Sequence, residues 1–398
     1  MNRKSPNNYD LPQSVVEAIR SVAGTEQAAL HEPTFDGNEW VYLKECLDLG
    51  FVSSVGKFVD RFERELENYT GSNHAIAVVN GTSALHIALK LAGVMNGDEV
   101  IVPALTFVAT GNAISYLGAT PHFVDSESRS LGIDPEKLKQ YLKINARVKD
   151  GVCINLHTRR IIRAMVPMHT FGHPSEMSKL IEIAEEFQLK VVEDSAESIG
   201  SLYQGKHTGT IGELGILSFN GNKSITTGGG GAILTNDLQL ATRARSLTTT
   251  AKIQHKWEFK HEEIAFNYRM PNINAALGCA QLEMITSKIN AQRELYEKYR
   301  KSFENVSGIK LLKEPIGSFS NYWLQTLLLD VPSRSTRDAI LEATNNEGFA
   351  TRPAWELLSN LPQFEGSPSS DLEQAFELAN RIINIPSSPK VNNDWKGN

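Results

Sequence analysis

The chain has 398 residues, of which 41% are hydrophobic and 22% are charged, a composition ordinary for a soluble globular protein of two or three domains. Its formal net charge is −6 and it has no basic cluster, which excludes the charge pattern of a nucleic-acid-binding protein. No run approaches the roughly 20 apolar residues of a membrane span, and the N-terminal residues lack the apolar core of a signal peptide. Three cysteines far apart in the sequence fit buried thiols, so we expect a cytoplasmic protein that binds neither nucleic acid nor membranes.

Between residues 74 and 237, short β-branched runs alternate with longer helical patterns such as Ser83–Met95 and Ser175–Phe187. Several runs are apolar on both faces, as expected for strands that helices cover on both sides. The predicted strands are His74–Asn80, Glu99–Phe107, Pro121–Asp125, Ala164–His169, Lys190–Asp194, Ile216–Asn220 and Gly231–Thr235. The alternation predicts an α/β fold with a mostly parallel, seven-stranded sheet.

The pattern changes after residue 275. Ala275–Tyr299 has the pattern of one long helix, Tyr322–Val331 that of a strand and Arg337–Asn345 that of a helix, which together predict a smaller α+β domain. We therefore divide the chain into an N-terminal segment (1–55) that packs on the small domain and the cleft, a large domain (56–275), a small C-terminal domain (276–389) and a flexible polar tail (390–398).

The segment Asn80-Gly81-Thr82-Ser83 ends one predicted strand and begins a helix. The free backbone N–H groups of a helix N-terminus, with two hydroxyl groups beside them, form a good anion site. The same residue types also cap helices that bind no ligand. Taken alone, this segment leaves both interpretations open.

A second polar segment follows the strand Lys190–Asp194. Ligands of open α/β sheets bind at the carboxyl ends of strands, which is where Asp194 lies. Its carboxylate could pair with a protonated ring nitrogen and keep a pyridine cofactor electron-poor. A cap of the turn that follows the strand is the alternative role for Asp194.

The third segment runs from Ser218 through Lys223 to four glycines, Gly228–Gly231, which an apolar strand follows at once. That strand favours a tight functional turn over a flexible linker. A lysine in a loop is ordinarily a solvated charge. Near an anion site and an acidic strand end, Lys223 is a candidate nucleophile for a carbonyl group, because burial and neighbouring charges can activate it.

No metal site is expected. His169 and His173 are four residues apart, but Gly172 and Pro174 interrupt them, so the two imidazoles cannot share the helix face that a zinc motif requires. Histidines of a loop near a polar site are the better interpretation.

The order of these segments resembles that of the sugar-nucleotide aminotransferases of the DegT/StrS class, which are pyridoxal-phosphate (PLP) enzymes of fold type I. The resemblance covers roughly residues 35–390. It is strongest in NGTSALHIAL, PALTFVATGNAI, VVEDSAESIGS, SFNGNKSITTGGGGAI and NYRMPNINAALGCAQLE. It implies an aspartate-aminotransferase-like fold, with a large PLP-binding domain and a smaller C-terminal domain.

The resemblance also implies roles for individual residues. Lys223 would carry PLP and move the proton between the amino donor and the cofactor, and Asp194 would pair with the ring nitrogen. Phe107 would stack on the ring, although a phenylalanine after a strand is more often a core residue. Asn267 would reach the phosphate in a neighbouring subunit, which implies a homodimer with active sites at its interface. The phosphate itself would be held by Gly81, Thr82, Ser83 and Ser218.

Glu197 departs from the family pattern, which often has glutamine or histidine there, near the phenolic oxygen of the cofactor. A carboxylate facing a phenolate is repulsive unless it carries a proton. Glu197 is therefore either protonated in a site of low dielectric constant or directed elsewhere.

Within the family, the sequence is most similar to the branch that makes 4-amino-4,6-dideoxy-N-acetylhexosamines for bacillosamine and legionaminic acid. The matching segments are GNEWVYLKECLDLGFVSSVGKFV, VPMHTFGHP, LTTTAK and TRPAWELL. The implied substrate is a UDP-linked 2-acetamido-4-keto-2,6-dideoxyhexose, with L-glutamate as amino donor. Its candidate contacts are Ser54, Lys57, Lys252 and Arg352, each of which could also be an ordinary surface residue or cap.

Four alternatives remain. The substrate could be another keto sugar, linked to GDP or dTDP, or the amino group could enter at C3. A related 3-dehydratase has histidine in place of the lysine, whereas this chain keeps Lys223. A regulator or scaffold without catalysis predicts loss of Lys223 or Asp194, and both are present.

Overall fold

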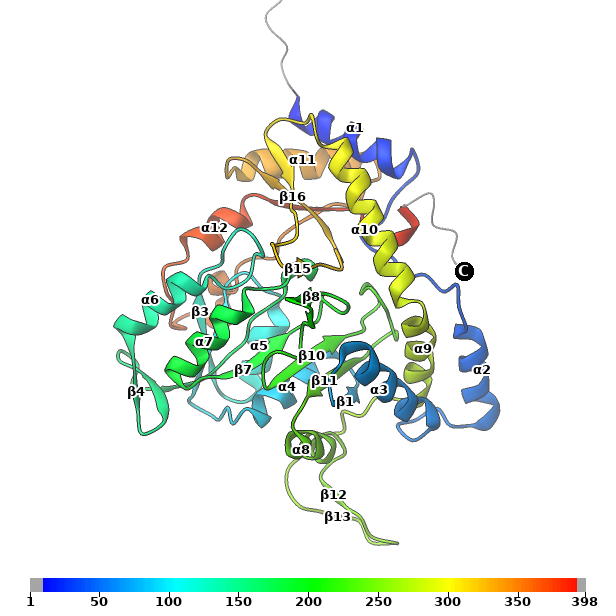
Figure 1. Cartoon of the computed structure of the whole chain (residues 1–398), viewed down its shortest axis with the longest axis vertical. Coiled ribbons are helices and arrows are strands. Elements are labelled where there is room, and N and C mark those ends of the chain that lie inside the picture. Colours follow the sequence, from blue (N-terminus) through cyan, green and yellow to red (C-terminus); the bar gives the residue numbers. More distant parts are fainter. Residues whose placement is uncertain (1–9, 392–398) are drawn as a thin grey trace, which may run out of the picture.

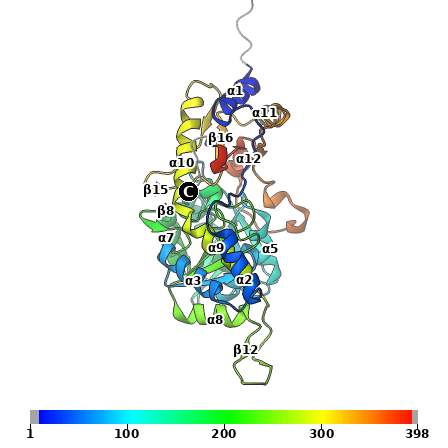
Figure 2. The same ribbon diagram turned by 90° about the vertical axis from the view of Figure 1, so that its right-hand side faces the viewer.

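The structure is a computed structural model that describes residues 10–391. Two packed units make up the molecule, a larger one around a nine-stranded sheet and a smaller one around a four-stranded sheet (Figure 1). A narrow hairpin projects from the larger unit and is seen in both Figure 1 and Figure 2. Within the described residues, no helix is long and apolar enough to cross a membrane.

All seven predicted strands are present and follow one another in the large sheet in the order β1-β11-β10-β7-β6-β2-β3. The pairs from β10 to β3 are parallel, and β11 is antiparallel to both of its neighbours, so the sheet is mostly parallel as predicted. The strands are β1 (His74–Val78), β2 (Glu99–Pro103), β3 (Thr120–Val124), β6 (Ile161–Met165), β7 (Lys190–Asp194), β10 (Leu214–Ser218) and β11 (Gly231–Thr235). A hairpin of β4 (Ala146–Lys149) and β5 (Val152–Asn155) adds two strands that were not predicted.

Helices cover both faces of this sheet, and the alternation along β1 shows how. Ile76 and Val78 pack in one core with α4, α5 and α8, whereas Ala75 and Ala77 pack on the other face with α3 and α9. Helices α6 and α7 cover the rest of that second face. The bounds are α3 (Lys57–Thr70), α4 (Gly81–Leu91), α5 (Val108–Tyr116), α6 (Pro135–Asn145), α7 (Met177–Phe187), α8 (Leu238–Thr248) and α9 (Asn272–Glu283).

The smaller unit packs helices on a four-stranded sheet of order β14-β16-β18-β17. Its core joins Leu327 of β16 to Val16 of α1, to Ile340 of α11 and to Leu295 and Tyr299 of α10. The bounds are α1 (Leu11–Ala23), α10 (Ile285–Ser302), α11 (Arg334–Asn346), α12 (Glu373–Ala379), β14 (Ile309–Leu311), β16 (Gln325–Leu329), β17 (Arg352–Pro353) and β18 (Ile382–Ile385).

The prediction of one long helix over Ala275–Tyr299 was wrong. The segment forms α9 and α10, which are separated by a single turn residue, Met284, at φ −97° and ψ −1°. The break lets α9 pack on α3 in the large unit, while the later part of α10 packs in the small unit. We infer that α10 links the two units.

The N-terminal segment divides between the two units. Helix α1 joins the core of the small unit, and α2 (Glu39–Leu49) places Cys46 in the core that α3 and α9 share. The predicted domain bounds stay a prediction, and most of the predicted tail (390–398) lies outside the described residues. The remaining short elements are β8 (Leu202–Tyr203), β9 (Lys206–His207), β12 (Lys252–Ile253), β13 (Lys260–His261), β15 (Ser318–Phe319) and four single 3-10 turns at Thr170–Gly172, Leu358–Asn360, Pro362–Phe364 and Pro389–Val391.

Candidate active site

The carboxyl ends of β1, β7 and β10 open onto one cavity of about 360 Å³, which we name the central cavity. The strand order brings these three ends close together although they are far apart in the sequence. This is where open α/β sheets bind their ligands. The predicted site residues that line the cavity are Gly81, Thr82, Phe107, Asp194, Glu197, Ser218 and Lys223.

One corner of the central cavity is suited to an anion. Asn80 caps α4, and its Oδ1 accepts a hydrogen bond of 2.7 Å from the backbone N–H of Ser83. The first N–H groups of a helix have no acceptor within the helix, and Gly81 and Thr82 line the cavity at this point. Gly81 packs so tightly that a Cβ there would lie 2.8 Å from the Cβ of Ser218. The segment is therefore both a helix cap and a candidate phosphate site, with Ser83 set behind the lining.

Asp194 is buried at the end of β7. Its Oδ2 accepts a hydrogen bond of 2.7 Å from the hydroxyl of Thr110, and its Oδ1 accepts one of 3.2 Å from the backbone N–H of Ala196. Burial raises the pKa of the Asp194 carboxyl, and these two hydrogen bonds oppose the shift. A cationic ligand in the cavity would favour the ionised carboxylate.

Glu197 points into the site and is also buried. Its Oε2 accepts a hydrogen bond of 2.9 Å from the backbone N–H of Phe171, and its Oε1 lies 3.3 Å from the Nζ of Lys223. Burial raises the pKa of Glu197 from 4.5 to about 7, against the opposing effect of the Lys223 ammonium. This carboxyl group can therefore carry a proton near neutral pH.

Lys223 lies in the turn after β10, with its side chain largely enclosed in the cavity. Its ammonium is bounded on one side by Glu197 and on another by the indole of Trp323, whose ring centroid is 4.0 Å from Nζ. Lys223 and Asp194 line the same cavity, so an amine and a carboxylate both face a single small ligand there.

A second cavity, which we name the side compartment, adjoins the central cavity and also has a volume of about 360 Å³. Both cavities are lined by Asn222, Trp323 and Trp355. Trp355 contacts Phe107 and Phe171, with ring centroids 6.1 and 5.0 Å apart. The apolar part of the side compartment consists of Leu30, Phe171, Trp323, Leu324, Pro353 and Trp355, and the polar part of His31, Asn222, Arg352 and Asn384.

His31, which lines the side compartment, has one ring nitrogen without a hydrogen-bond partner in the described part of the chain. Its Nε2 lies 3.0 Å from the amide nitrogen of Gln292 and accepts from it, so Nδ1 of the neutral ring carries the hydrogen. That Nδ1 is buried and has no partner among the described residues. Burial lowers the pKa of His31 to about 3, with further effect from Lys288 and Lys223, so the ring stays neutral.

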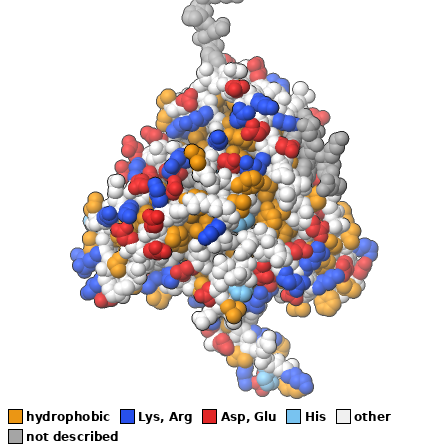
Figure 3. All heavy atoms as spheres, in the orientation of Figure 1, with side chains coloured by type: hydrophobic (Ala, Val, Ile, Leu, Met, Phe, Trp, Pro, Cys, Tyr) orange, Lys and Arg blue, Asp and Glu red, His pale blue; other side chains and the backbone are white. Residues whose placement is uncertain are grey.

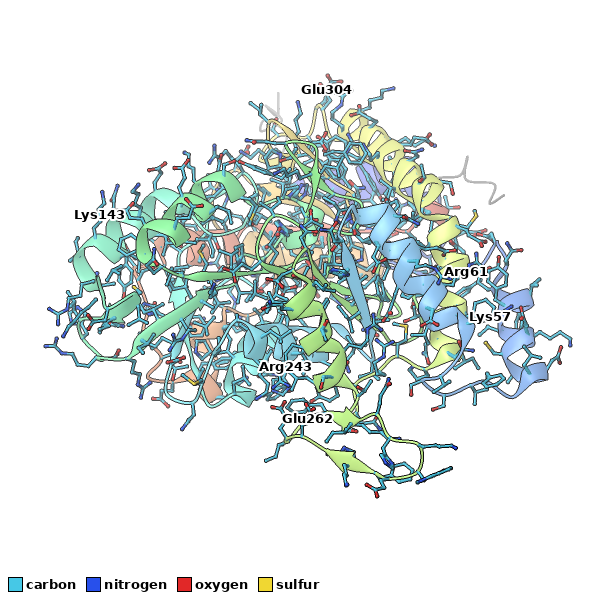
Figure 4. All side chains as sticks on the ribbon, turned by 60° about the horizontal axis from the view of Figure 1, so that its bottom comes forward. Lys57, Arg61, Lys143, Arg243, Glu262 and Glu304 are labelled. Carbon is cyan, nitrogen blue, oxygen red and sulfur yellow. The ribbon has the colours of Figure 1, made fainter. Side chains whose placement is uncertain are left out.

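Of the four predicted substrate contacts, Arg352 alone lies at either cavity among the described residues. Ser54 lies in the loop before α3, and Lys57 pairs with Glu45 at the side of the molecule, where Figure 4 labels it. Lys252 lies on the projecting hairpin of β12 and β13. The roles of these residues stay predictions.

Asn267, the residue expected to reach a neighbouring subunit, is exposed and forms a backbone bridge with Thr249 near the base of the projecting hairpin. It does not line the central cavity of its own chain, within the residues described. Its position leaves it available to a second copy of the chain.

Sequence reasoning missed four residues of the site, namely Thr110, Trp323, Trp355 and His31. Thr110 lies on α5 and reaches Asp194 through tertiary packing alone. The other three come from the N-terminal segment and the small unit, so no local spacing connects them to the large-domain motifs. Thr110 and Trp355 lie in two of the segments that carry the family resemblance, and Trp323 is a tryptophan at the start of a predicted strand, but none of these signals gave the residue a role.

Together the residues at the central cavity form a donor set that fits PLP. An anion corner lies at Gly81, Thr82 and Ser218, a buried carboxylate at Asp194 and an enclosed amine at Lys223. The tight approach of Gly81 to Ser218 leaves room at the corner only because residue 81 has no side chain. A phosphate, a protonated pyridine nitrogen and a carbonyl carbon would each meet a complementary group.

Comparison with known proteins agrees with this chemistry. Residues 33–396 match the model of the DegT/DnrJ/EryC1/StrS aminotransferase family. A GDP-perosamine synthase of Vibrio cholerae is 37% identical over 369 residues, covering 92% of this chain and 95% of that protein. EpsN of Bacillus subtilis, described as a putative pyridoxal phosphate-dependent aminotransferase, is 34% identical over 372 residues and covers 92% of each chain.

A solved structure supports the fold. The crystal structure of the aminotransferase TlmJ from Streptoalloteichus hindustanus superposes with a TM-score of 0.82 at 26% identity, covering 91% of this chain and 94% of TlmJ. A protein of Streptococcus pneumoniae described as a putative sugar aminotransferase, solved in its PLP form, superposes with a TM-score of 0.79 at 22% identity, covering 91% of this chain and 93% of that one, and so agrees in fold. The chain belongs to the DegT/DnrJ/EryC1/StrS aminotransferase family, and it is a PLP-dependent aminotransferase that acts on a nucleotide sugar.

Proposed function

We propose that this enzyme transfers the amino group of L-glutamate to C4 of a UDP-linked 2-acetamido-4-keto-2,6-dideoxyhexose, releasing the UDP-4-amino sugar and 2-oxoglutarate. The observation that carries the proposal is the meeting of Lys223, Asp194 and the anion corner in one cavity, beside a compartment of suitable chemistry. Bound PLP would supply an electron-withdrawing ring that stabilises negative charge at the carbon losing a proton.

The chain's own residues would bind the cofactor and move the protons. Gly81, Thr82 and Ser218 would bind the phosphate and fix the register of the cofactor, and Asp194 would hold the proton on its ring nitrogen. Lys223 would take a proton from the donor carbon and return it at the other end of the reacting system, first with glutamate and then, in reverse, with the sugar. Glu197, when protonated, would donate a hydrogen bond toward the phenolic oxygen.

The side compartment supports an N-acetylated sugar. An acetamido group has an apolar methyl and a carbonyl acceptor, and the compartment has aromatic walls and is lined by His31 and Arg352, two residues whose side chains carry N–H donors. Leaving a buried donor unpaired costs free energy, so a ligand carbonyl that pairs with Nδ1 of His31 would be favoured over a group without an acceptor there. The similarity of GNEWVYLKECLDLGFVSSVGKFV and TRPAWELL to the N-acetylhexosamine branch points the same way.

A GDP-linked 4-keto-6-deoxysugar is the second candidate. Three relatives, from Vibrio cholerae, Escherichia coli O157:H7 and Caulobacter vibrioides, are GDP-perosamine synthases at 37%, 35% and 36% identity. The two candidates differ in the nucleotide and in the acetamido group at C2 of the first, so the side compartment is the place where this chain would distinguish the sugars.

The enzyme would act as a homodimer. Large apolar side chains are exposed along residues 35–55, and more lie on the projecting hairpin, where the space-filling view shows orange patches at the same places (Figure 3). Soluble monomers rarely leave such a series of apolar residues in water, and Asn267 lies near the base of the same hairpin. The exposed residues are Phe35, Trp40, Val41, Leu47, Leu49, Phe51, Val52, Val55, Trp257, Phe259 and Ile264.

Steady-state kinetics with both sugars test the substrate. The PLP-loaded enzyme is given L-glutamate with either UDP-2-acetamido-4-keto-2,6-dideoxyglucose or GDP-4-keto-6-deoxymannose, and kcat/KM is measured for each. We expect the UDP sugar to be preferred at least about tenfold, because a site built to bind an acceptor rejects a substrate that lacks it. A preference for the GDP sugar would contradict the UDP assignment and favour the second candidate. Light scattering of the same sample checks the dimer.

A further inference from the structure

Trp323, from the small unit, contacts the catalytic lysine and its loop at once. Its indole N–H donates a hydrogen bond of 2.7 Å to the backbone carbonyl of Asn222, the residue before Lys223. The face of the same indole lies 4.0 Å from the Nζ of Lys223. One buried side chain therefore holds both the backbone and the ammonium of the lysine.

The tryptophan is itself firmly held. Its backbone N–H donates to Oδ1 of Asn321 at 2.8 Å, and the amide nitrogen of Asn321 donates to the carbonyls of Glu197 and Ile199, both at 3.0 Å. The segment that carries Trp323 is thus tied to the loop that carries Glu197. Glu197 and Trp323, the two neighbours of the Lys223 ammonium, are therefore linked to each other through the hydrogen bonds of Asn321.

The residue before Trp323, Tyr322, has a strained backbone conformation, which sets the direction of the chain at the indole. Tyr322 has φ +48°, a conformation that residues other than glycine seldom adopt. It is kept there by a stack on Tyr296, with ring centroids 4.2 Å apart, and by its hydroxyl, which accepts from the N–H of Glu314 at 3.1 Å. Backbone strain of this kind persists where the surroundings enforce it, often at functional sites.

The ammonium of Lys223 therefore lies between the Glu197 carboxyl and the face of Trp323. The charge of this ammonium also acts on Asp194 and His31, where it favours a lower pKa of each group. An indole face attracts a cation through its electron-rich ring and, unlike a carboxylate, takes no proton from it. It restricts a long side chain that otherwise has many rotamers.

We propose that Trp323 is a positioning residue that holds Lys223 in place while its amine is free of the cofactor and carries the proton. Lysine has to leave the cofactor when an amino donor binds, and it must then keep its amine near the reacting carbon. Trp323 and Glu197 give that free amine a fixed location. This role goes beyond the proposed function and is independent of which sugar is the substrate.

The first test uses the cofactor-free protein. Reductive methylation under limiting reagent, read by peptide mass spectrometry, measures how fast Lys223 reacts relative to the other lysines of the same chain. Trp323→Leu removes the ring, and Trp323→Phe keeps an aromatic face but loses the N–H. We expect Lys223 to react about 3- to 30-fold faster in Trp323→Leu and close to the wild-type rate in Trp323→Phe. Trp355→Leu is the matched control, because Trp355 lines the same cavity but its indole packs on Phe107 and Phe171.

The second test follows the glutamate half-reaction of the PLP-loaded enzyme by absorbance. We expect Trp323→Leu to lower its maximal rate by about 10- to 100-fold with little change in the glutamate concentration for half-saturation, because misplacement of a reacting group affects the chemical step. Trp323→Phe should recover most of the rate. If Trp323→Leu folds poorly, Trp323→Phe is the deciding variant. A slower half-reaction together with faster methylation of Lys223 in Trp323→Phe would mean that the indole N–H bond to the Asn222 carbonyl, and not the ring face, positions the lysine. Unchanged labelling and rate in Trp323→Leu would overturn the proposal.

Discussion

The buried carboxyl group of Glu197 gives the folding stability of the cofactor-free protein a specific dependence on pH. Its pKa is about 7 in the folded chain and has the ordinary value of 4.5 when exposed. Below pH 4.5 the carboxyl group is protonated in both the folded and the unfolded chain. Folding then buries no charge at Glu197, and the free energy of unfolding has its highest value with respect to this group. Between the two values the folded chain binds the proton and the unfolded chain does not, so the free energy of unfolding falls as pH rises.

Each pH unit in this interval changes the free energy by about 1.4 kcal/mol per proton, so the interval from 4.5 to about 7 amounts to about 3 kcal/mol. Glu197→Gln keeps the shape and the hydrogen-bonding capacity but cannot ionise. We therefore expect the variant to gain about 3 kcal/mol relative to wild type between pH 4.5 and pH 8.

Urea denaturation of the cofactor-free proteins at a series of pH values measures this difference. Glu304→Gln, at an exposed glutamate after α10 that Figure 4 labels, is the matched control and should follow wild type at every pH. A difference between Glu197→Gln and wild type that stays constant across the range would refute the reasoning, because it would mean that Glu197 titrates alike in the folded and unfolded chains.

Three further variants test the central cavity. Thr110→Val removes the 2.7 Å hydrogen bond to Asp194 at nearly constant shape, and the glutamate half-reaction should slow by roughly 10- to 100-fold in stopped-flow absorbance, as expected for a bond to a charged group. Asp194→Asn removes the charge itself and should slow the same reaction by at least about 100-fold, so a smaller loss than in Thr110→Val would contradict the assigned role. Gly81→Ala places a Cβ 2.8 Å from that of Ser218, and the dissociation constant of PLP, measured by fluorescence titration, should rise by at least about tenfold.

The large sheet could be predicted because its strands are buried on both faces. All five residues of β2 and all five of β11 are buried, and most of them are apolar, as expected for strands that helices cover on both faces. The β4–β5 hairpin was missed because three of the four residues of β4 are exposed, so it has no apolar pattern. The break at Met284 was missed because α9 and α10 continue one another in sequence and differ only in the unit on which each packs.

The part of the site that lies at the ends of strands could be predicted from the sequence. Asp194 and Ser218 end two strands of the same sheet and Gly81 comes shortly after a third, so the topology brings them together. Trp323 and His31 could not be predicted in this way. They come from other units of the chain, and their contacts depend on how those units pack over the cavity.

Identification of the lysine that binds PLP tests the central claim most directly. Lys288 is the instructive rival, because burial lowers its pKa to about 8, but its Nζ donates to Thr34 and Gln281 and it does not line the central cavity. The PLP-loaded enzyme is reduced with borohydride before and after addition of L-glutamate, and the modified peptide is found by mass spectrometry. We predict a pyridoxyl group on Lys223 before glutamate and its loss afterwards. Modification of Lys288 or of any other lysine, with Lys223 unmodified, would contradict the account.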